Sequence, residues 1–210
     1  MCKERIPATT KTGLYTFIRG FAAFALKTVL PVRYHGREVL DMDGPFIIIG
    51  NHQSWLDPVV MAVGTRRHQL AIMAKKELAA NQLLSNAGRQ LHAILVDRGN
   101  TDMEAMRTSM KALRGGEVMG IFPEGTRYHA GLMEELETGA AMLTLRSGAP
   151  LVPMYIPEKL KLFRRTECYV GEPIDYADLK AQGINSETCK ALLERITAWY
   201  TAKKNEVDAN

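Results

Sequence analysis

The sequence predicts an α/β fold with a central, largely parallel sheet flanked by helices, and an amphipathic membrane-interface helix at the N-terminus. Two observations favour this fold. Short apolar runs rich in β-branched residues alternate with segments of helical periodicity, which is typical of a parallel sheet between helices. Polar clusters also follow several of the apolar runs directly, where open α/β sheets place their chemistry.

Length and composition are consistent with one folded domain and a small appendage. The chain has 210 residues, of which 46% are hydrophobic, and a formal net charge of +4. This mild, dispersed basic excess suits an anionic membrane surface or a small anionic substrate rather than nucleic acid. Three cysteines lie far apart, at Cys2, Cys168 and Cys189. Their spacing predicts reduced thiols, with no disulfide framework and no zinc site.

Residues 12–30 have an amphipathic helical pattern. One broad face of the helical wheel carries the apolar residues Leu14, Phe17, Ile18, Phe21, Phe24, Ala25 and Val29. Because Arg19 and Lys27 interrupt the apolar run, spanning a bilayer would bury two cations, whereas lying in the interface leaves both in water. We therefore expect residues 1–31 to be a membrane-associating segment and residues 32–210 to be the α/β domain. The alternative is a helix that packs on its own domain.

Residues 46–49 form a short apolar run that predicts a buried strand. His52 follows the strand, and Asp57 lies five residues later. On one continuous helix these two side chains would diverge. They can meet if His52 lies in a turn and Asp57 is the N-cap of a helix with Pro58 at its first position. The competing N-cap, Ser54, would put Pro58 where its missing N–H removes a helical hydrogen bond.

Two interpretations of His52 and Asp57 stay open from these residues alone. In the first, Asp57 holds one imidazole nitrogen and the other nitrogen takes a proton from a substrate hydroxyl. In the second, Asp57 only caps a helix and His52 is an ordinary loop histidine. The chain has no G-x-S-x-G motif, so a covalent serine nucleophile is not indicated.

The remaining elements are predicted in order along the chain. Further strands are expected at residues 32–36, 70–74, 92–96, 117–122, 151–156 and 167–170. Helices are expected at residues 58–63, 77–87, 132–146 and 186–203, and from a capping box at Thr101 to a stop at Gly115. Pro153 suggests that its strand lies at an edge of the sheet or carries a bulge.

Two more polar clusters follow predicted strands. Arg98 follows one of them, and the run from Glu124 to Arg127 follows another. Gly125 would let the backbone approach a ligand closely, and Arg127 offers a planar fork that suits phosphate. The alternative is a surface turn with a solvated arginine.

Together these motifs resemble those of the glycerolipid acyltransferases. The similar stretches are residues 51–57, which resemble the family's histidine-x4-aspartate box, and residues 94–98, 122–127 and 152–156, which resemble its second, third and fourth motifs. All four occur in the family's order within roughly residues 32–173, and the box together with the Glu-Gly-Thr motif is specific. The resemblance is greatest to the short bacterial members that acylate 1-acylglycerol-3-phosphate.

The resemblance implies transfer of a fatty acyl group from a thioester to the free hydroxyl of 1-acylglycerol-3-phosphate, which forms phosphatidic acid in phospholipid biosynthesis. His52 would be the general base and Asp57 would orient it. Substrate binding would fall to Arg98, Glu124, Gly125, Thr126 and Arg127. The two arginines would hold the phosphate, Glu124 would orient Arg98 or the acceptor, and backbone N–H groups near Gly125 would stabilise the oxyanion.

No cofactor or metal is expected beyond the co-substrate, which would be an acyl-CoA or acyl carrier protein thioester. The expected partners are the lysophospholipid acceptor, the acyl donor and a membrane surface, with no nucleic acid. The expected location is the cytoplasmic face of the cell membrane, as a peripheral or monotopic protein.

One departure from the family concerns the acceptor. Where the family often has a Phe-Lys-like pair before Gly139, this chain has Leu136 and Glu137, so an acid replaces a basic group. The alternative acceptors are another lysolipid and glycerol-3-phosphate. The rival function is a non-catalytic lipid-binding protein on the same fold, although pure binding needs no poised base.

Overall fold

The computed structural model describes residues 11–75, 92–96, 103–125 and 132–209. Its helices are α1 (Gly13–Thr28), α2 (Asp57–Gly64), α4 (Met103–Arg114), α5 (Thr138–Ser147), α6 (Ala177–Ala181) and α7 (Ser186–Asp208), with a 3-10 helix η1 (Arg37–Asp41). Its strands are β1 (Val32–His35), β2 (Ile47–Gly50), β3 (Leu70–Lys75), β4 (Ala93–Val96), β5 (Val118–Ile121), β6 (Leu151–Tyr155) and β7 (Thr166–Val170). The predicted helix at residues 77–87 and the capping residue Thr101 lie outside the described residues.

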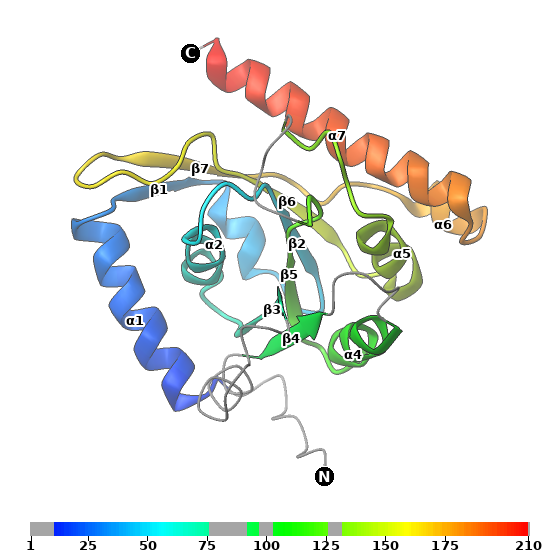
Figure 1. Ribbon diagram of the computed structural model, residues 1–210, viewed down its shortest axis with the longest axis horizontal. Coiled ribbons are helices and arrows are strands. Elements are labelled where there is room, and N and C mark those ends of the chain that lie inside the picture. The colour runs from blue at the N-terminus through cyan, green and yellow to red at the C-terminus, as the bar shows by residue number, and fades with distance from the viewer. Residues whose placement is uncertain (1–10, 76–91, 97–102, 126–131, 210) are drawn as a thin grey trace.

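The strands form one sheet in the order β1-β7-β6-β2-β5-β3-β4, with helices on both faces (Figure 1). β2 pairs in parallel with β6 and β5, and β3 is parallel to β5 and β4. β7 is antiparallel to β6 and parallel to β1, so these two outer strands run the other way. The predicted α/β fold with a largely parallel sheet is confirmed, and all seven predicted strands are present to within one residue at each end.

Two apolar cores lie on opposite faces of the sheet, one under α1 and α2 and the other under α4, α5 and α7. The side chains of β2 alternate between them, with Ile47 and Ile49 in one core and Ile48 in the other. Such burial on both faces explains why the strand is continuously apolar. At Gly120 an added Cβ would lie 2.5 Å from the Sδ of Met61, so the missing side chain lets α2 approach the sheet closely.

α1 packs on α2 with one face and presents the other to solvent. Tyr15 and Leu26 are buried, and the guanidinium of Arg19 donates to the carbonyl oxygens of Ala62 (3.1 Å) and Val63 (3.0 Å). The large exposed side chains are Phe17 (75%), Ile18 (42%), Phe21 (71%) and Phe24 (65%). Arg19, which was expected to stay in water, is thus only partly exposed. The helix packs on its own domain and still turns the predicted phenylalanines outward.

In the part of the chain that the structure describes, no helix has the length and apolar character needed to cross a membrane.

The C-terminal end of α2 is held by two guanidinium groups. Besides Arg19, Arg37 donates from Nε to the carbonyl oxygen of Gly64 (2.9 Å) and from Nη2 to that of Val63 (2.5 Å). The last carbonyls of a helix lack intrahelical donors and carry partial negative charge. The two guanidinium groups supply the missing hydrogen-bond donors and a favourable positive charge. α2 has only eight residues, and a helix this short depends on such contacts.

Pro153 does not mark an edge strand, contrary to the prediction. It lies in β6, which is flanked by β2 and β7 inside the sheet. The carbonyl oxygen of Pro153 accepts from the N–H of Gly171, so its backbone groups face the β7 side. β7 pairs with β6 only at the two residues that follow, Met154 and Tyr155. The missing N–H of Pro153 therefore falls at the end of that ladder, where it costs little.

The start of α5 also differs from the prediction. The helix begins at Thr138 rather than at Leu132. Met133 has a positive φ of 54°, and its N–H donates to Glu124 instead of continuing a helix. The N–H of Glu137 donates to the carbonyl oxygen of Pro123 (2.8 Å). The apolar residues that suggested a helix here belong to a segment that is bound to the loop after β5.

α7 is longer than predicted and runs to Asp208, beyond the expected end at Lys203. It begins with a capping box between Asn185 and Thr188, and Lys203 pairs with Glu206 in the additional turn. The short helices α6 and η1 were not predicted because they hold too few residues to show a period.

Candidate active site

Asn51 holds the loop between β2 and α2 against the end of β6. Its side-chain oxygen accepts from the N–H of Ile156, and its side-chain nitrogen donates to the carbonyl oxygen of the same residue, both at 2.9 Å. Asn51 is only 1% exposed, and the two bonds satisfy its buried amide. Beside it, Gly50 has no room for a side chain, because an added Cβ would lie 2.7 Å from the Cε of Met61. The strand therefore ends in a tightly held loop immediately before His52.

His52 and Asp57 meet in the structure, as the catalytic interpretation requires. Nδ1 of His52 lies 3.1 Å from Oδ2 of Asp57. Because a carboxylate only accepts hydrogen bonds, Nδ1 carries the proton in this contact, and Nε2 is the nitrogen with the lone pair in the neutral ring. The Asp57 side chain is 1% exposed and the His52 side chain is 16% exposed. No residue in the described ranges bonds to Nε2, so this nitrogen is available to a substrate.

Asp57 is not the N-cap of α2, contrary to the prediction. The helix begins at Asp57 itself, and its N-cap is Leu56, whose side chain makes no capping bond. The carboxylate turns back to the preceding loop, where Oδ2 accepts from the N–H groups of Gln53 (2.6 Å) and Ser54 (2.7 Å) and Oδ1 accepts from Oγ of Ser54 (3.0 Å). These donors and the positive end of the α2 dipole offset the cost of burying the anion.

Phe122 fixes one face of the histidine ring. The two rings stack with 4.4 Å between their centroids and 29° between their planes. Phe122 directly follows β5, the parallel neighbour of β2, so both rings lie at the same edge of the sheet. The motif that begins at Phe122 was predicted, but neither this stacking nor the clamp by Asn51 was. The sequence signal for each contact was that Phe122 and Asn51 each lie at or just after the end of a predicted strand.

Glu124 braces the His52 loop against the segment before α5. Its Oε2 accepts from the N–H of His52 (2.6 Å), and its Oε1 accepts from the N–H of Met133 (3.1 Å). Burial raises the pKa of the Glu124 carboxyl above its ordinary value, although the two N–H donors oppose the shift. Glu124 was expected to contact substrate or Arg98. Its described bonds are to backbone, so it positions His52.

Glu124→Gln should remove one component of the pH dependence of stability. The pKa of Glu124 is higher in the folded chain than in the unfolded chain, so the folded state binds more protons in the mildly acidic range. The free energy of unfolding of the unmodified protein therefore falls as pH rises through that range, and the variant should lack this part of the slope. Urea unfolding at several values between about pH 4 and pH 7 measures it. Equal slopes in the two proteins would contradict the assignment.

Gly125 closes the loop after β5 with a φ of +65°, a conformation that favours glycine. Its own N–H donates to the carbonyl oxygen of Phe122 (3.2 Å) and is thus used inside the turn. Any oxyanion donors near Gly125 must therefore include other N–H groups. An added Cβ at Gly125 would lie 3.0 Å from Oε1 of Glu137. Glu137, the acid that stands where the family often has a basic residue, therefore lies directly beside the Glu-Gly-Thr motif.

A family model described as "Acyltransferase" matches residues 31–157, which contain His52, Asp57 and Glu124. The chain belongs to this acyltransferase family. A 1-acyl-sn-glycerol-3-phosphate acyltransferase from Bacillus subtilis is 34% identical over 90% of this chain and 98% of its own. A protein of the same name from Streptococcus pneumoniae is 28% identical over 87% of this chain and 70% of its own.

The fold of this acyltransferase has also been seen in a crystal. The structure of the 1-acyl-sn-glycerophosphate acyltransferase PlsC from Thermotoga maritima matches it with a TM-score of 0.67 and 23% identity. The match covers 93% of this chain and 80% of that one, so the two proteins share the fold.

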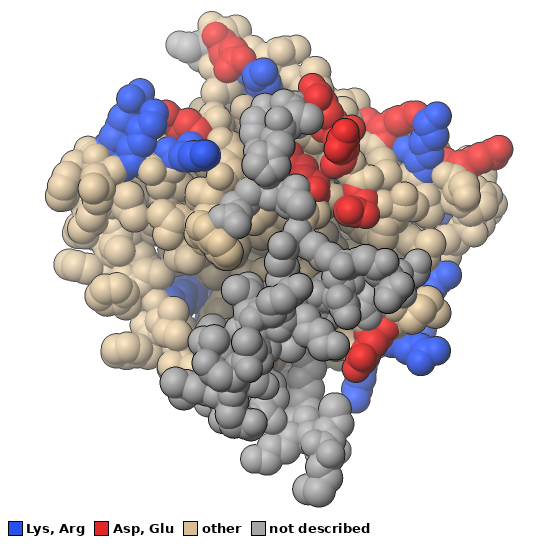
Figure 2. All heavy atoms as spheres, viewed as in Figure 1, with Lys and Arg blue, Asp and Glu red and all other residues tan. Residues whose placement is uncertain are grey.

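One side of the acyltransferase site is acidic. Glu134, Glu135 and Glu137 are exposed in the segment before α5, and Figure 2 shows acidic side chains gathered over that segment. These carboxylates would repel an anionic substrate that approached over this segment. Three predicted binding residues lie outside the described residues, and their roles stay predictions: Arg98, Thr126 and Arg127.

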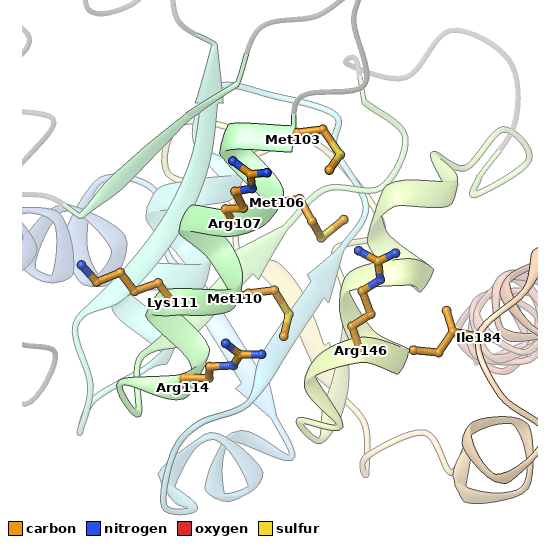
Figure 3. Close-up of a pocket in the computed structure, with 8 residues that line it drawn as sticks. All are labelled: Met103, Met106, Arg107, Met110, Lys111, Arg114, Arg146 and Ile184. Carbon is orange, nitrogen blue, oxygen red and sulfur yellow. The ribbon is translucent and has the colours of Figure 1, made fainter.

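A groove of about 570 Å³ between α4 and α5 is not part of this site. Figure 3 shows Met106 and Met110 of α4 on the side that faces α5, with Arg107 and Arg146 at the margins. None of the residues that line the groove belongs to the acyltransferase motifs.

Proposed function

We propose that this acyltransferase transfers a fatty acyl group from a thioester to the free hydroxyl of 1-acylglycerol-3-phosphate and so forms phosphatidic acid. The observation that carries the proposal is the contact between Nδ1 of His52 and the buried carboxylate of Asp57, which leaves Nε2 as the ring nitrogen that can act on a substrate. The names of the relatives from Bacillus subtilis and Streptococcus pneumoniae, both 1-acyl-sn-glycerol-3-phosphate acyltransferases, support the choice of acceptor.

In the proposed reaction, Nε2 of His52 takes the proton of the acceptor hydroxyl while its oxygen attacks the thioester carbonyl carbon. The tetrahedral intermediate then expels the thiolate by cleavage of the carbon–sulfur bond, and the imidazolium returns the proton to the sulfur. Asp57 stabilises the transient imidazolium and keeps Nδ1 protonated. Phe122 and Glu124 hold the ring and its backbone in place, so little reorganisation is needed during the transfer.

An acceptor panel tests the proposal. The purified protein is given lysophosphatidate, lysophosphatidylcholine or glycerol-3-phosphate, each with acyl-CoA and with acyl carrier protein as donor. We expect efficient acylation of lysophosphatidate alone, with at least one of the two donors. Efficient acylation of glycerol-3-phosphate instead, or no acylation with either donor, would overturn the proposed acceptor.

We propose further that the exposed face of α1 lies in the membrane interface. A lysophospholipid acceptor and its product both reside in the bilayer, and the three exposed phenylalanines of α1 offer an apolar surface that faces away from the domain. Because Arg19 is bonded to α2, Lys27 is the cation of α1 that is exposed near its C-terminal end. Attachment through α1 should thus depend more on apolar contact than on charge.

Phe17→Ser with Phe21→Ser should release most of the protein from anionic vesicles while the α/β domain stays folded. Each such ring contributes about 1.5–3 kcal/mol when it leaves water, so the loss of two is large. Co-sedimentation measures the bound fraction, and circular dichroism checks folding. Met103→Ser, which alters an exposed apolar residue of α4, is the matched control. If the unmodified protein remains in the supernatant with vesicles present, the interfacial role of α1 is wrong.

A further inference from the structure

The loop between β6 and β7, residues 156–165, exposes two large apolar side chains at its tip. Leu162 is 67% exposed and Phe163 is 78% exposed. Phe163 also has a positive φ of 56°, which is unfavourable for a bulky residue. An ordinary hairpin would place a glycine or asparagine here. Strained backbone that holds an aromatic ring in water is the kind of feature that points to a function.

The tip is fixed to the domain by specific bonds. The N–H of Phe163 donates to the carbonyl oxygen of Val29 at the end of α1 (2.7 Å), and Lys161 and Arg164 form a β-bridge across the tip. Glu158 pairs with Lys161 at 2.5 Å. The two exposed side chains therefore belong to an ordered projection, and its position beside the end of α1 is visible at the left of Figure 1.

Cations surround the apolar tip. Residues 156–165 contain four cations and one acid, Glu158, which gives a net charge of 4 − 1 = +3. The four exposed cations are Lys159, Lys161, Arg164 and Arg165. Figure 2 shows basic side chains projecting from this part of the molecule. An apolar tip within a ring of cations complements a surface that has anionic headgroups over an apolar interior.

The loop also lies at the same edge of the sheet as the reacting histidine. β6 is parallel to β2, so the loop leaves β6 where the His52 loop leaves β2. Ile156, the first residue of the loop, carries the two hydrogen bonds to Asn51, which precedes His52. Through Val29 the loop is also continuous with α1 and its exposed phenylalanines.

We infer that the β6–β7 loop is a second membrane-contact element, which inserts Leu162 and Phe163 among the headgroups of an anionic bilayer while the flanking cations bind lipid phosphates. This inference rests on the proposed membrane function of α1 and adds a second point of attachment to it. Two points fix the orientation of the protein on the surface, whereas attachment through α1 alone would let the whole domain tilt about the axis of that helix.

The test is the partition of Leu162→Ser with Phe163→Ser between buffer and vesicles of phosphatidylglycerol and phosphatidylethanolamine. We expect the partition coefficient to fall by at least about tenfold. Ile184→Ser, at an exposed apolar residue before α7, should leave it unchanged. A second variant, Phe163→Gly, relieves the strained φ while removing the ring. It should therefore weaken vesicle binding with a melting temperature equal to or above that of the unmodified protein.

Charge is tested separately. Lys159→Gln with Arg165→Gln should weaken binding to anionic vesicles and reduce its dependence on salt. The matched control, Arg107→Gln with Arg146→Gln, removes the same charge from the groove shown in Figure 3 and should change neither.

Unchanged partition of the Leu162→Ser, Phe163→Ser variant would overturn the inference. If that variant also lost its binding to purified acyl carrier protein, the loop would be a contact for this protein instead of for lipid. Acylation of monomeric lysophosphatidate, without vesicles, tests the proposed reaction separately from membrane contact. A protein that acylates it but binds vesicles independently of the loop would refute the contact and leave the reaction standing. An inactive protein whose vesicle binding still depends on the loop would refute the reaction and leave the contact standing.

Discussion

His52→Ala should lower the turnover number of the acyltransferase by at least about two orders of magnitude, because it removes the proposed general base. The site around it should survive. Asp57 keeps its three donors from Gln53 and Ser54, and Glu124 still accepts from the backbone N–H of residue 52, which alanine retains. Steady-state rates with lysophosphatidate and a saturating acyl donor measure the effect.

The control for this variant is Phe122→Leu, which keeps an apolar contact but loses the stacked ring. We expect it to reduce turnover by roughly tenfold or less, because the base remains and only its orientation loosens. A His52→Ala variant that is folded by circular dichroism and retains normal turnover would remove His52 from the mechanism.

Asp57→Asn should also reduce turnover by about two orders of magnitude or more, while the fold is kept. An asparagine oxygen at the position of Oδ2 can still accept from His52 and from the loop N–H groups, and its amide can donate to Oγ of Ser54. What is lost is the negative charge that stabilises the imidazolium. The expected stability cost is therefore small, about 1 kcal/mol.

Asp57→Ala separates this electrostatic role from the structural one. It leaves two partly buried N–H groups and the Nδ1 proton of His52 without an acceptor, so we expect the free energy of unfolding to fall by about 3 kcal/mol. Urea unfolding and turnover are measured on both variants. Normal turnover in Asp57→Asn would show that the pairing only supports the loop.

Much of the fold was predictable because its signals are local. A strand covered on both faces is a short run of β-branched residues, and residues 46–49 are such a run. The meeting of His52 with Asp57 was also predictable, since a turn followed by a helix start is one of few ways to close five residues. The N-cap assignment failed by one residue, because a capping carboxylate and one that turns back to its own loop share the same sequence pattern.

The remaining features depend on contacts between distant segments, which no local pattern records. Glu124 braces His52 across 72 positions, and Asn51 clamps Ile156 across 105. The sheet accommodates Pro153 in an inner strand because β7 pairs with β6 only at Met154 and Tyr155. The exposed tip at Phe163 was also not predicted, because the run around it reads as an ordinary basic turn.

The short helix α2 has a buried anion at its first residue and two guanidinium groups on its last carbonyls, each sign at the end of the dipole that it favours. The carboxylate is buried and the two guanidinium groups are partly buried, so mobile ions screen these charges less than they screen exposed cations at a lipid surface. Ionic strength should therefore affect the binding of exposed cations to lipid more than it affects the charges that hold α2 and the His52 loop. Salt that weakens the contact proposed for the cations of the β6–β7 loop should therefore leave the contact between His52 and Asp57 in place, and an acceptor dispersed in water should still be acylated.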